Sequence, residues 1–224
     1  MTRTVDRRTV RTRRALQDAL AQEIHATGDL SQVTVTNVTK RADVTRRTFY
    51  SHYKDIPELV SSVEAEVVSE LVPMVLKISQ VTLPELEAAI RAFEPCPHAA
   101  ELLANIRENG ELLSALLGEG GDPAFVELIK RQVRVVVEKR ALDGFETQMM
   151  AGFDYYLTYV ISAEGGVLVR WLTTGMRESD EMMARIMTSL LFVRPGDLYG
   201  RPIDFDIASL HTCALEQGKE LTHG

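Results

Sequence analysis

Apolar residues recur three and four positions apart along most of the chain, with polar residues between them, which is the spacing of amphipathic α-helices. In segment 11–28, Leu16, Leu20 and Ile24 follow this spacing, and Gly28 stands where the helix should stop. Turn sequences separate the later periodic segments. We expect those helices at about 83–93, 98–117, 123–141, 145–173 and 179–193. The pattern predicts an all-α fold.

Cap residues divide the first sixty positions into shorter helices. Thr34 or Thr36 can cap a second helix, Thr45 a third, and Asp55 a long fourth one. Segment 31–39 also alternates β-branched and polar residues as a strand would, but no partner strand is near in the sequence. The second and third helices are joined only by residues 42–44, which is the arrangement of a helix-turn-helix.

The third helix has one apolar side and one polar side. Phe49 is expected to point inward with Val38, Ala42 and Val44. The residues left to point outward are Thr45, Arg46, Arg47, Tyr50 and His52, with Lys54 at the helix exit. Arginine can donate two hydrogen bonds to guanine, whereas tyrosine, histidine, lysine and threonine suit phosphate oxygens. A solvated, charged helix face is the alternative interpretation.

Charge is distributed unevenly along the chain. The net charge is −7, yet residues 1–54 hold 11 Lys/Arg against 5 Asp/Glu, and the remainder holds 14 against 27. A basic first quarter on an acidic body favours a small polyanion-binding head. This asymmetry supports contact with double-stranded DNA.

The composition argues against membrane, secreted and metal-binding proteins. With 45% hydrophobic residues the chain can form a core, and no apolar run reaches the length of a membrane span. The first fourteen residues lack the apolar region of a secretory signal, and Cys96 and Cys213 lack metal-ligand spacing. We therefore expect a cytoplasmic protein without cofactor, metal or membrane partner. No catalytic motif is present either, which predicts that the protein is not an enzyme.

The stretch VTVTNVTKRADVTRRTFYSHYKDIPELV, residues 33–60, resembles the DNA-binding domain of the TetR family of transcriptional regulators. The likeness is specific over about residues 10–60, with Tyr53 where phenylalanine is usual. It implies that Thr36 lies near a phosphate. It further implies that Thr45, Arg46, Arg47 and Thr48 face the DNA groove, and that Tyr50, His52 and Lys54 hold the DNA backbone.

Three residues depart from the family pattern. Asp43 replaces the usual turn glycine, and aspartate tolerates the left-handed backbone better than most residues. Arg47 stands where a small residue is common, which favours an operator that contains G·C pairs. Ile56 replaces a lysine that often contacts phosphate.

The resemblance and the helical pattern together divide the chain into four parts. Residues 1–14 form a flexible basic arm whose arginines either contact DNA or only solubilise the protein. Residues 15–56 form a helix-turn-helix domain, with the motif at about 34–53. Residues 57–194 form a larger helical domain for regulation and dimerisation, and residues 195–224 form a C-terminal extension.

The acidic body is expected to dimerise through about residues 145–193, where Ala163, Gly165 and Gly166 permit close helix approach. Alternatively, these helices face the chain's own core. The body carries no charge pattern that identifies an effector. Large apolar residues are the candidates for an effector pocket, although most such residues belong to cores. They are Phe93, Leu103, Ile106, Phe125, Met149, Met150, Phe153 and Tyr156.

The sequence thus predicts a sequence-specific DNA-binding transcriptional regulator. The family resemblance implies a homodimeric repressor on a pseudo-palindromic operator, modulated by a small-molecule effector. The alternative is a protein-interaction module on the same fold with little sequence-specific DNA binding.

Overall fold

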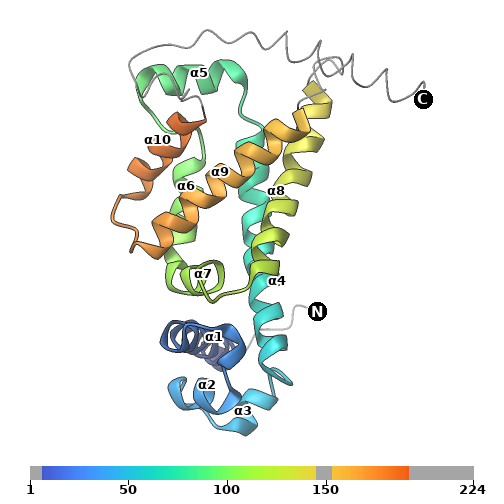
Figure 1. Ribbon diagram of the computed structural model, residues 1–224, viewed down its shortest axis with the longest axis vertical. Helices are drawn as coiled ribbons and strands as arrows, with labels where there is room; N and C mark the ends of the chain where they lie inside the picture. Colours follow the sequence, from blue (N-terminus) through green and yellow to red (C-terminus); the bar gives the residue numbers. More distant parts are fainter. Residues whose placement is uncertain (1–6, 145–152, 192–224) are drawn as a thin grey trace, which may run out of the picture.

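The computed structural model describes residues 7–144 and 153–191. Within these ranges the chain is all-helical, as the apolar spacing predicts, and contains no strand. None of the described helices is long and apolar enough to span a membrane. The molecule is elongated, with three N-terminal helices at one end and the remaining helices stacked above them (Figure 1).

The N-terminal end contains α1, one turn of 3-10 helix, α2, α3 and the start of α4. Their bounds are α1 Arg7–Thr27, η1 Leu30–Gln32, α2 Val35–Arg41, α3 Arg46–Tyr50 and α4 Ile56–Ser79. Side-chain caps set these boundaries, because Thr34, Thr45 and Asp55 each accept a hydrogen bond from a backbone N–H in the first turn of the helix that follows. At the end of α1, Gly28 adopts φ +69° and stops the helix, as expected.

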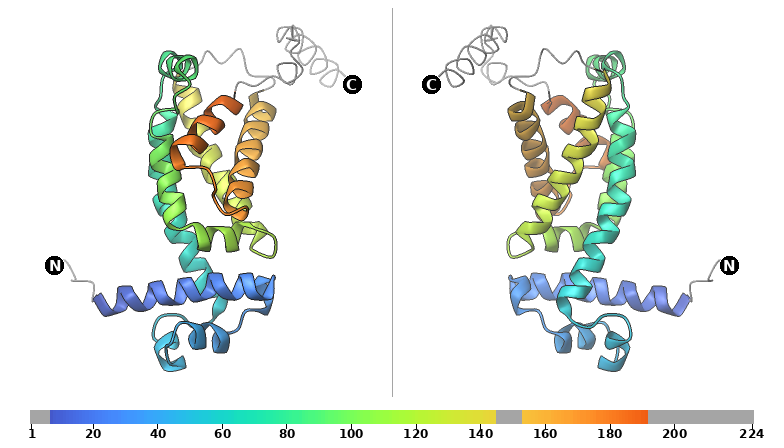
Figure 2. Two further views of the ribbon diagram at one scale, coloured as in Figure 1. Left: turned by 90° about the vertical axis from the view of Figure 1, so that its left-hand side faces the viewer. Right: turned by 90° about the vertical axis from the view of Figure 1, so that its right-hand side faces the viewer.

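The first helix begins earlier than the sequence pattern indicates. Residues 7–14, which we expected in a flexible arm, are helical in α1. Two of their arginines are tied to the body: Arg13 pairs with Glu66 at 3.2 Å, and Arg14 donates to Asn109 Oδ1 at 3.2 Å. These contacts across the chain extend the helix, and the arginine pattern alone could not reveal them. The first turns of α1 still project sideways beyond the other helices (Figure 2).

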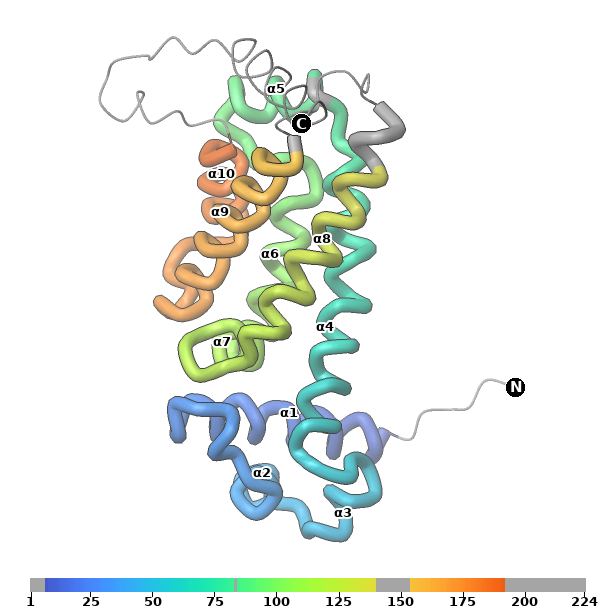
Figure 3. The backbone as a smooth tube through the Cα atoms, turned by 45° about the vertical axis from the view of Figure 1, so that its right-hand side comes forward, coloured from blue at the N-terminus to red at the C-terminus, as the bar shows by residue number. Residues whose placement is uncertain are grey.

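Within the described ranges, six further helices form the body beside the long helix α4, which runs upward from the N-terminal end (Figure 3). Their bounds are α5 Leu83–Ala92, α6 Ala99–Glu108, α7 Gly110–Leu117, α8 Pro123–Gly144, α9 Phe153–Thr173 and α10 Asp180–Leu190. The sequence predicted one helix over 98–117, but the chain turns at Asn109 and splits it into α6 and α7. Residue 110, directly after this turn, is glycine. The Met176 side chain can therefore occupy the space that a side chain at residue 110 would fill.

Two apolar cores hold these helices together, and α7 contributes to both. Leu112, Ala115 and Leu116 of α7 belong to the lower core with α1, α2, α3 and α4. Leu113 belongs to the upper core, which contains Trp171 and the buried side of α10. The two ends of the molecule are therefore joined through α7 as well as through the long helix α4, whose Val67 also packs against both cores.

The helices predicted to form a dimer interface bury part of their apolar surface within the chain. On α10, Met183, Ala184 and Thr188 are buried, and the first two join the upper core. On α9, Tyr155, Tyr156 and Tyr159 stay exposed. Residues 145–152 and 192–193 of the predicted interface lie outside the described residues, as do residues 1–6 and the predicted extension 195–224. A dimer through these helices stays a prediction.

Candidate nucleic-acid interface

The candidate surface is built by α2, the turn after it and α3, at the end of the molecule farthest from α5 (Figure 1). The turn passes through Asp43, whose φ is +51°, so this residue does take the left-handed backbone expected of it. The Val44 N–H donates to the Thr39 carbonyl at 3.0 Å, which closes the turn. Phe49 and Val38 are fully buried beneath it, as predicted.

An ion pair between α2 and α1 also holds this three-helix unit together. Arg41 of α2 reaches Glu23 of α1, with 2.6 Å between Nη2 and Oε1, and the Glu23 side chain is only 8% exposed. A carboxylate so buried is costly unless it is paired, so the pair locks α2 against α1. Sequence reasoning did not identify this pair, because residues 18 positions apart on two helices give no local signal.

The Phe49 ring is the centre of an aromatic cluster under α3. Tyr53 is 5% exposed and packs 5.9 Å from Phe49 between ring centroids, in the place where phenylalanine is usual. Its hydroxyl is buried, and no described residue hydrogen-bonds to it. Tyr50 meets the other side of Phe49 edge-on at 5.6 Å but remains 57% exposed. The cluster therefore supports Tyr50 from below and leaves its hydroxyl toward solvent.

The two arginines of α3 have different surroundings. Arg46 donates from Nη2 to the Thr36 hydroxyl at 2.7 Å, which joins the starts of α3 and α2. Arg47 is exposed, and no other described side chain binds it. Thus Arg46 is held in one orientation, whereas the Arg47 guanidinium has all its donors available.

The remaining predicted site residues lie around these arginines. The Thr45 hydroxyl caps α3 and lies 2.9 Å from the Thr48 hydroxyl, so both threonines also have a structural role. His52 and Lys54 follow α3, with His52 half-buried and Lys54 exposed. The structure thus brings all eight predicted residues onto or beside two short helices. Their contact with DNA stays a prediction.

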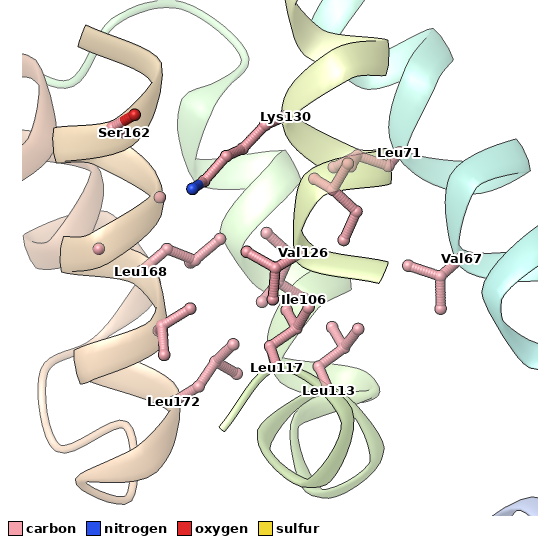
Figure 4. Close-up of a pocket in the computed structure, with 14 residues that line it drawn as sticks. Val67, Leu71, Ile106, Leu113, Leu117, Val126, Lys130, Ser162, Leu168 and Leu172 are labelled. Atoms are coloured by element: carbon pink, nitrogen blue, oxygen red, sulfur yellow. The ribbon is translucent and has the colours of Figure 1, made fainter. Parts of the chain in front are cut away.

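A cavity of about 310 Å³ lies in the body, between α4, α6, α7, α8 and α9. Leu71, Ile106, Leu113, Leu168 and Leu172 line it, and the Lys130 amine extends from α8 toward α9 among them (Figure 4). Gly165 and Gly166 form part of its α9 wall.

Of the eight apolar candidates for an effector pocket, Ile106 is the one that lines this cavity. Leu103 and Phe125 are core residues, whereas Phe93 and Tyr156 are exposed. Met149, Met150 and the side chain of Phe153 lie outside the described residues. Lys130 and the two glycines were missed as cavity residues, since neither size nor periodicity marks them.

Burial of carboxyl groups changes two pKa values in the body. Burial raises the pKa of Glu164 on α9 to about 7. Burial and the neighbouring Asp122 carboxylate raise the pKa of Glu64 on α4 to about 7. In the described part of the chain, no group of three or more His, Cys, Asp or Glu is placed to hold a metal ion.

Two comparisons with known proteins bear on the function. Residues 94–192 match a TetR-type family model described as "Transcriptional regulator C-terminal region". The chain is 26% identical over 195 residues to a Bacillus subtilis (strain 168) protein named "Uncharacterized HTH-type transcriptional regulator YxbF". That match covers 85% of this chain and 47% of the relative, so the chain spans about half of the relative's length.

Proposed function

We propose that the chain is a TetR-family transcriptional regulator, as its similarities to that family's C-terminal region and to a helix-turn-helix regulator support, and that it acts as a homodimeric, sequence-specific repressor controlled by a small molecule. The main support for DNA binding is the exposed start of α3. There Arg47 is unpaired among the described residues, and Arg46 is held by Thr36. Recognition helices enter the major groove with their N-terminal residues foremost. The net positive charge of residues 1–54 supports the same role.

We assign distinct roles to the residues of this surface. Arg47 reads a base, because its free donors match the O6 and N7 acceptors of guanine. Arg46 lies beside Thr36, so the two contact one phosphate or one base edge together. Thr45, Thr48, Tyr50, His52 and Lys54 set the register on the DNA backbone. Tyr50 is the strongest of these, since the Phe49 ring fixes its orientation.

A two-fold dimer through α9 and α10 would present two such surfaces to one DNA duplex. The exposed tyrosines of α9 and the exposed Met182 and Leu190 of α10 support this interface. Two heads separated by about 34–36 Å would then contact the half-sites of a pseudo-palindromic operator.

The cavity supports control by a ligand. Its wall includes Leu113 and Leu117 of α7, while Leu112 and Leu116 of the same helix pack in the lower core with α1. A ligand that shifts α7 would therefore also shift α1 and the head, and a change in head separation changes operator affinity.

The test is selection of binding sites from random duplex DNA, followed by affinity measurements at several salt concentrations. We expect a pseudo-palindromic site. Arg47→Ala should relax preference at one base pair per half-site, at a cost of about 1–3 kcal/mol. Tyr50→Ala should weaken binding to all sequences alike. Arg91→Ala is the matched control, since Arg91 is an exposed arginine on α5, at the opposite end of the molecule.

Recovery of no enriched motif would contradict this proposal. It would favour the alternative in which the fold serves as a protein-interaction module and DNA binding is weak, salt-labile and independent of sequence.

A further inference from the structure

We propose that the cavity and a basic groove beside it form a single binding site for an amphiphilic anion, a molecule with an apolar tail and an oxyanion head. This inference rests on the proposed ligand control and specifies the chemical class of the ligand. It follows from an apolar cavity and a polar groove that adjoin each other and share Lys130 and Ser162 as lining residues.

The cavity suits the apolar tail of such a ligand. Apart from Lys130, Ser162 and the two glycines, its lining is aliphatic, contributed by leucine, isoleucine and valine side chains. Its volume of about 310 Å³ lies within the range of sites that bind small molecules. A tail of that size removes its own apolar surface and that of the cavity from water, which is the main source of affinity in such sites.

The groove suits the oxyanion head group of such a ligand. It measures about 290 Å³ and lies between α8 and α9, with Lys130, Arg131 and Arg134 from α8 and the hydroxyl groups of Thr158 and Ser162 from α9. The amine, the guanidinium groups and the hydroxyl groups can donate hydrogen bonds to oxygen atoms of an anion, whereas Glu127 and Ile161, which complete the lining, cannot. Lys130 lies where the two hollows meet, and its amine points across toward Ser162 (Figure 4).

Nearby carboxylates leave part of this positive charge available. Glu127 lies 2.8 Å from the Lys130 amine, and Arg134 is held by Glu138 at 3.0 Å and by Asp154. Glu127 and Asp154 are well exposed, so water can solvate them when an anion replaces them. Arg131 has no ion-pair partner among the described residues. We therefore assign Arg131 and Lys130 to the anionic head and Arg134 to the support of the groove.

Binding is measured on the full chain by titration calorimetry and by tryptophan fluorescence. The chain has one tryptophan, Trp171, which is 2% exposed and precedes Leu172 in the cavity wall. The probes are decanoate, decyl phosphate, decanol and decyltrimethylammonium, all below their micellar concentrations. We expect both anions to bind and to change Trp171 emission. Decanol should bind at least tenfold more weakly, and the cation should not bind. The ratio of the two anion affinities identifies a carboxylate or a phosphate as the preferred head.

Three variants distinguish binding of the ligand's anionic head group from binding of its apolar tail. Arg131→Gln should weaken binding of both anions by about fivefold to tenfold and leave decanol unchanged. Lys139→Gln removes an exposed lysine of α8 that lines neither hollow, and should change nothing. Gly165→Leu should abolish binding of every probe by filling the cavity. Since a Cβ atom at residue 165 would meet no atom within 4 Å and the leucine side chain would extend into the cavity, this variant should keep its melting temperature.

Equal affinity for decanol and decanoate would overturn the assignment of the groove to an anionic head group. Tight binding of decyltrimethylammonium would overturn it as well. Failure of all probes to bind would overturn the whole site. Light scattering would then show whether a second copy of the chain covers the cavity.

The DNA selection is scored independently of these titrations. If a DNA motif is recovered but no probe binds, this inference fails and the proposed function stands. If probes bind but no motif is recovered, the binding site stands and the proposed function fails.

Discussion

Glu64 lies on α4 with its carboxyl group against that of Asp122, which precedes α8. Its Oε1 atom is buried, and no residue of the described ranges donates a hydrogen bond to it. Two carboxylates can share a hydrogen bond only if one of them is protonated, so Glu64 retains its proton to a higher pH than usual. Burial is the larger cause, Asp122 is the second, and together they raise the pKa of Glu64 from 4.5 to about 7.

This pair makes stability depend on pH in a defined direction. Between pH 4.5 and 7 the folded protein holds a proton on Glu64 that the unfolded chain has lost. The stabilising contribution is therefore complete below about pH 4.5 and is lost as the pH rises through 7. We expect Glu64→Gln to raise the melting temperature at pH 8 by about 2–4 °C, the effect of roughly 1 kcal/mol in a protein of this size. It should change the melting temperature much less at pH 5.

Glu70→Gln is the control for this measurement, because Glu70 is an exposed residue of the same helix. It should leave the difference in melting temperature between pH 5 and pH 8 unaltered. Glu164 adds a dependence of the same sign through its own raised pKa, so Glu64→Gln should reduce the pH effect without removing it. An unchanged pH profile in Glu64→Gln would show that the pKa of Glu64 is not raised in the folded protein.

Residue-level sequence reasoning succeeded where the chemistry is local. Thr45 caps α3 and Asp43 takes a positive φ because each conformation is determined within three or four residues. The contact between Arg46 and Thr36 was not predicted, although both were named as site residues. It depends on the crossing of two helices, which the sequence pattern does not specify.

At the level of elements, the loop between α7 and α8 forms a backbone contact between the N-terminal helices and the body. Gly120 adopts φ +83°, and its carbonyl accepts a hydrogen bond from the Leu30 N–H at 2.8 Å. A Cβ atom at residue 120 would lie 2.1 Å from the Gly28 carbonyl oxygen. Only glycine permits both the left-handed backbone and this approach.

We therefore expect Gly120→Ala to destabilise the protein by at least about 1–2 kcal/mol, the cost of a left-handed residue with a Cβ, with the steric clash in addition. Thermal denaturation measures this loss. Gly165→Ala is the control, since it places a Cβ in open space within a helix and should stabilise the protein by roughly 0.5–1 kcal/mol. Equal melting temperatures for Gly120→Ala and the wild type would mean that the loop moves away from Gly28 at no cost.

Helix periodicity predicted most elements but not their breaks. Segment 98–117 has continuous helical spacing, yet the chain turns at Asn109 because Arg14 and Met176, from distant segments, pack there. In the same way, residues 7–14 are helical and not a free arm, and Arg13 and Arg14 find partners on α4 and at the α6–α7 turn. Such boundaries depend on tertiary contacts and are not encoded in local spacing.

At the scale of the whole molecule, the charge asymmetry and the helical pattern predicted a basic head on an acidic helical body. The arrangement of the body around a cavity was not predictable, because it depends on five helices meeting at Lys130 and the glycines of α9. In the proposed regulator, α3 would contact the operator and α9 with α10 would join two copies, while α7 lies between the N-terminal helices and the cavity.

The position of α7 in both cores also determines how the protein unfolds. Val67 and Leu117 each pack against the lower and the upper core, so loss of one core exposes apolar surface of the other. Head and body are therefore not independent folding units, and denaturant should unfold them in a single cooperative transition. Fluorescence of Trp171 in the upper core and far-ultraviolet circular dichroism of all helices should give the same midpoint. Separate midpoints would mean that the head melts while the body stays folded.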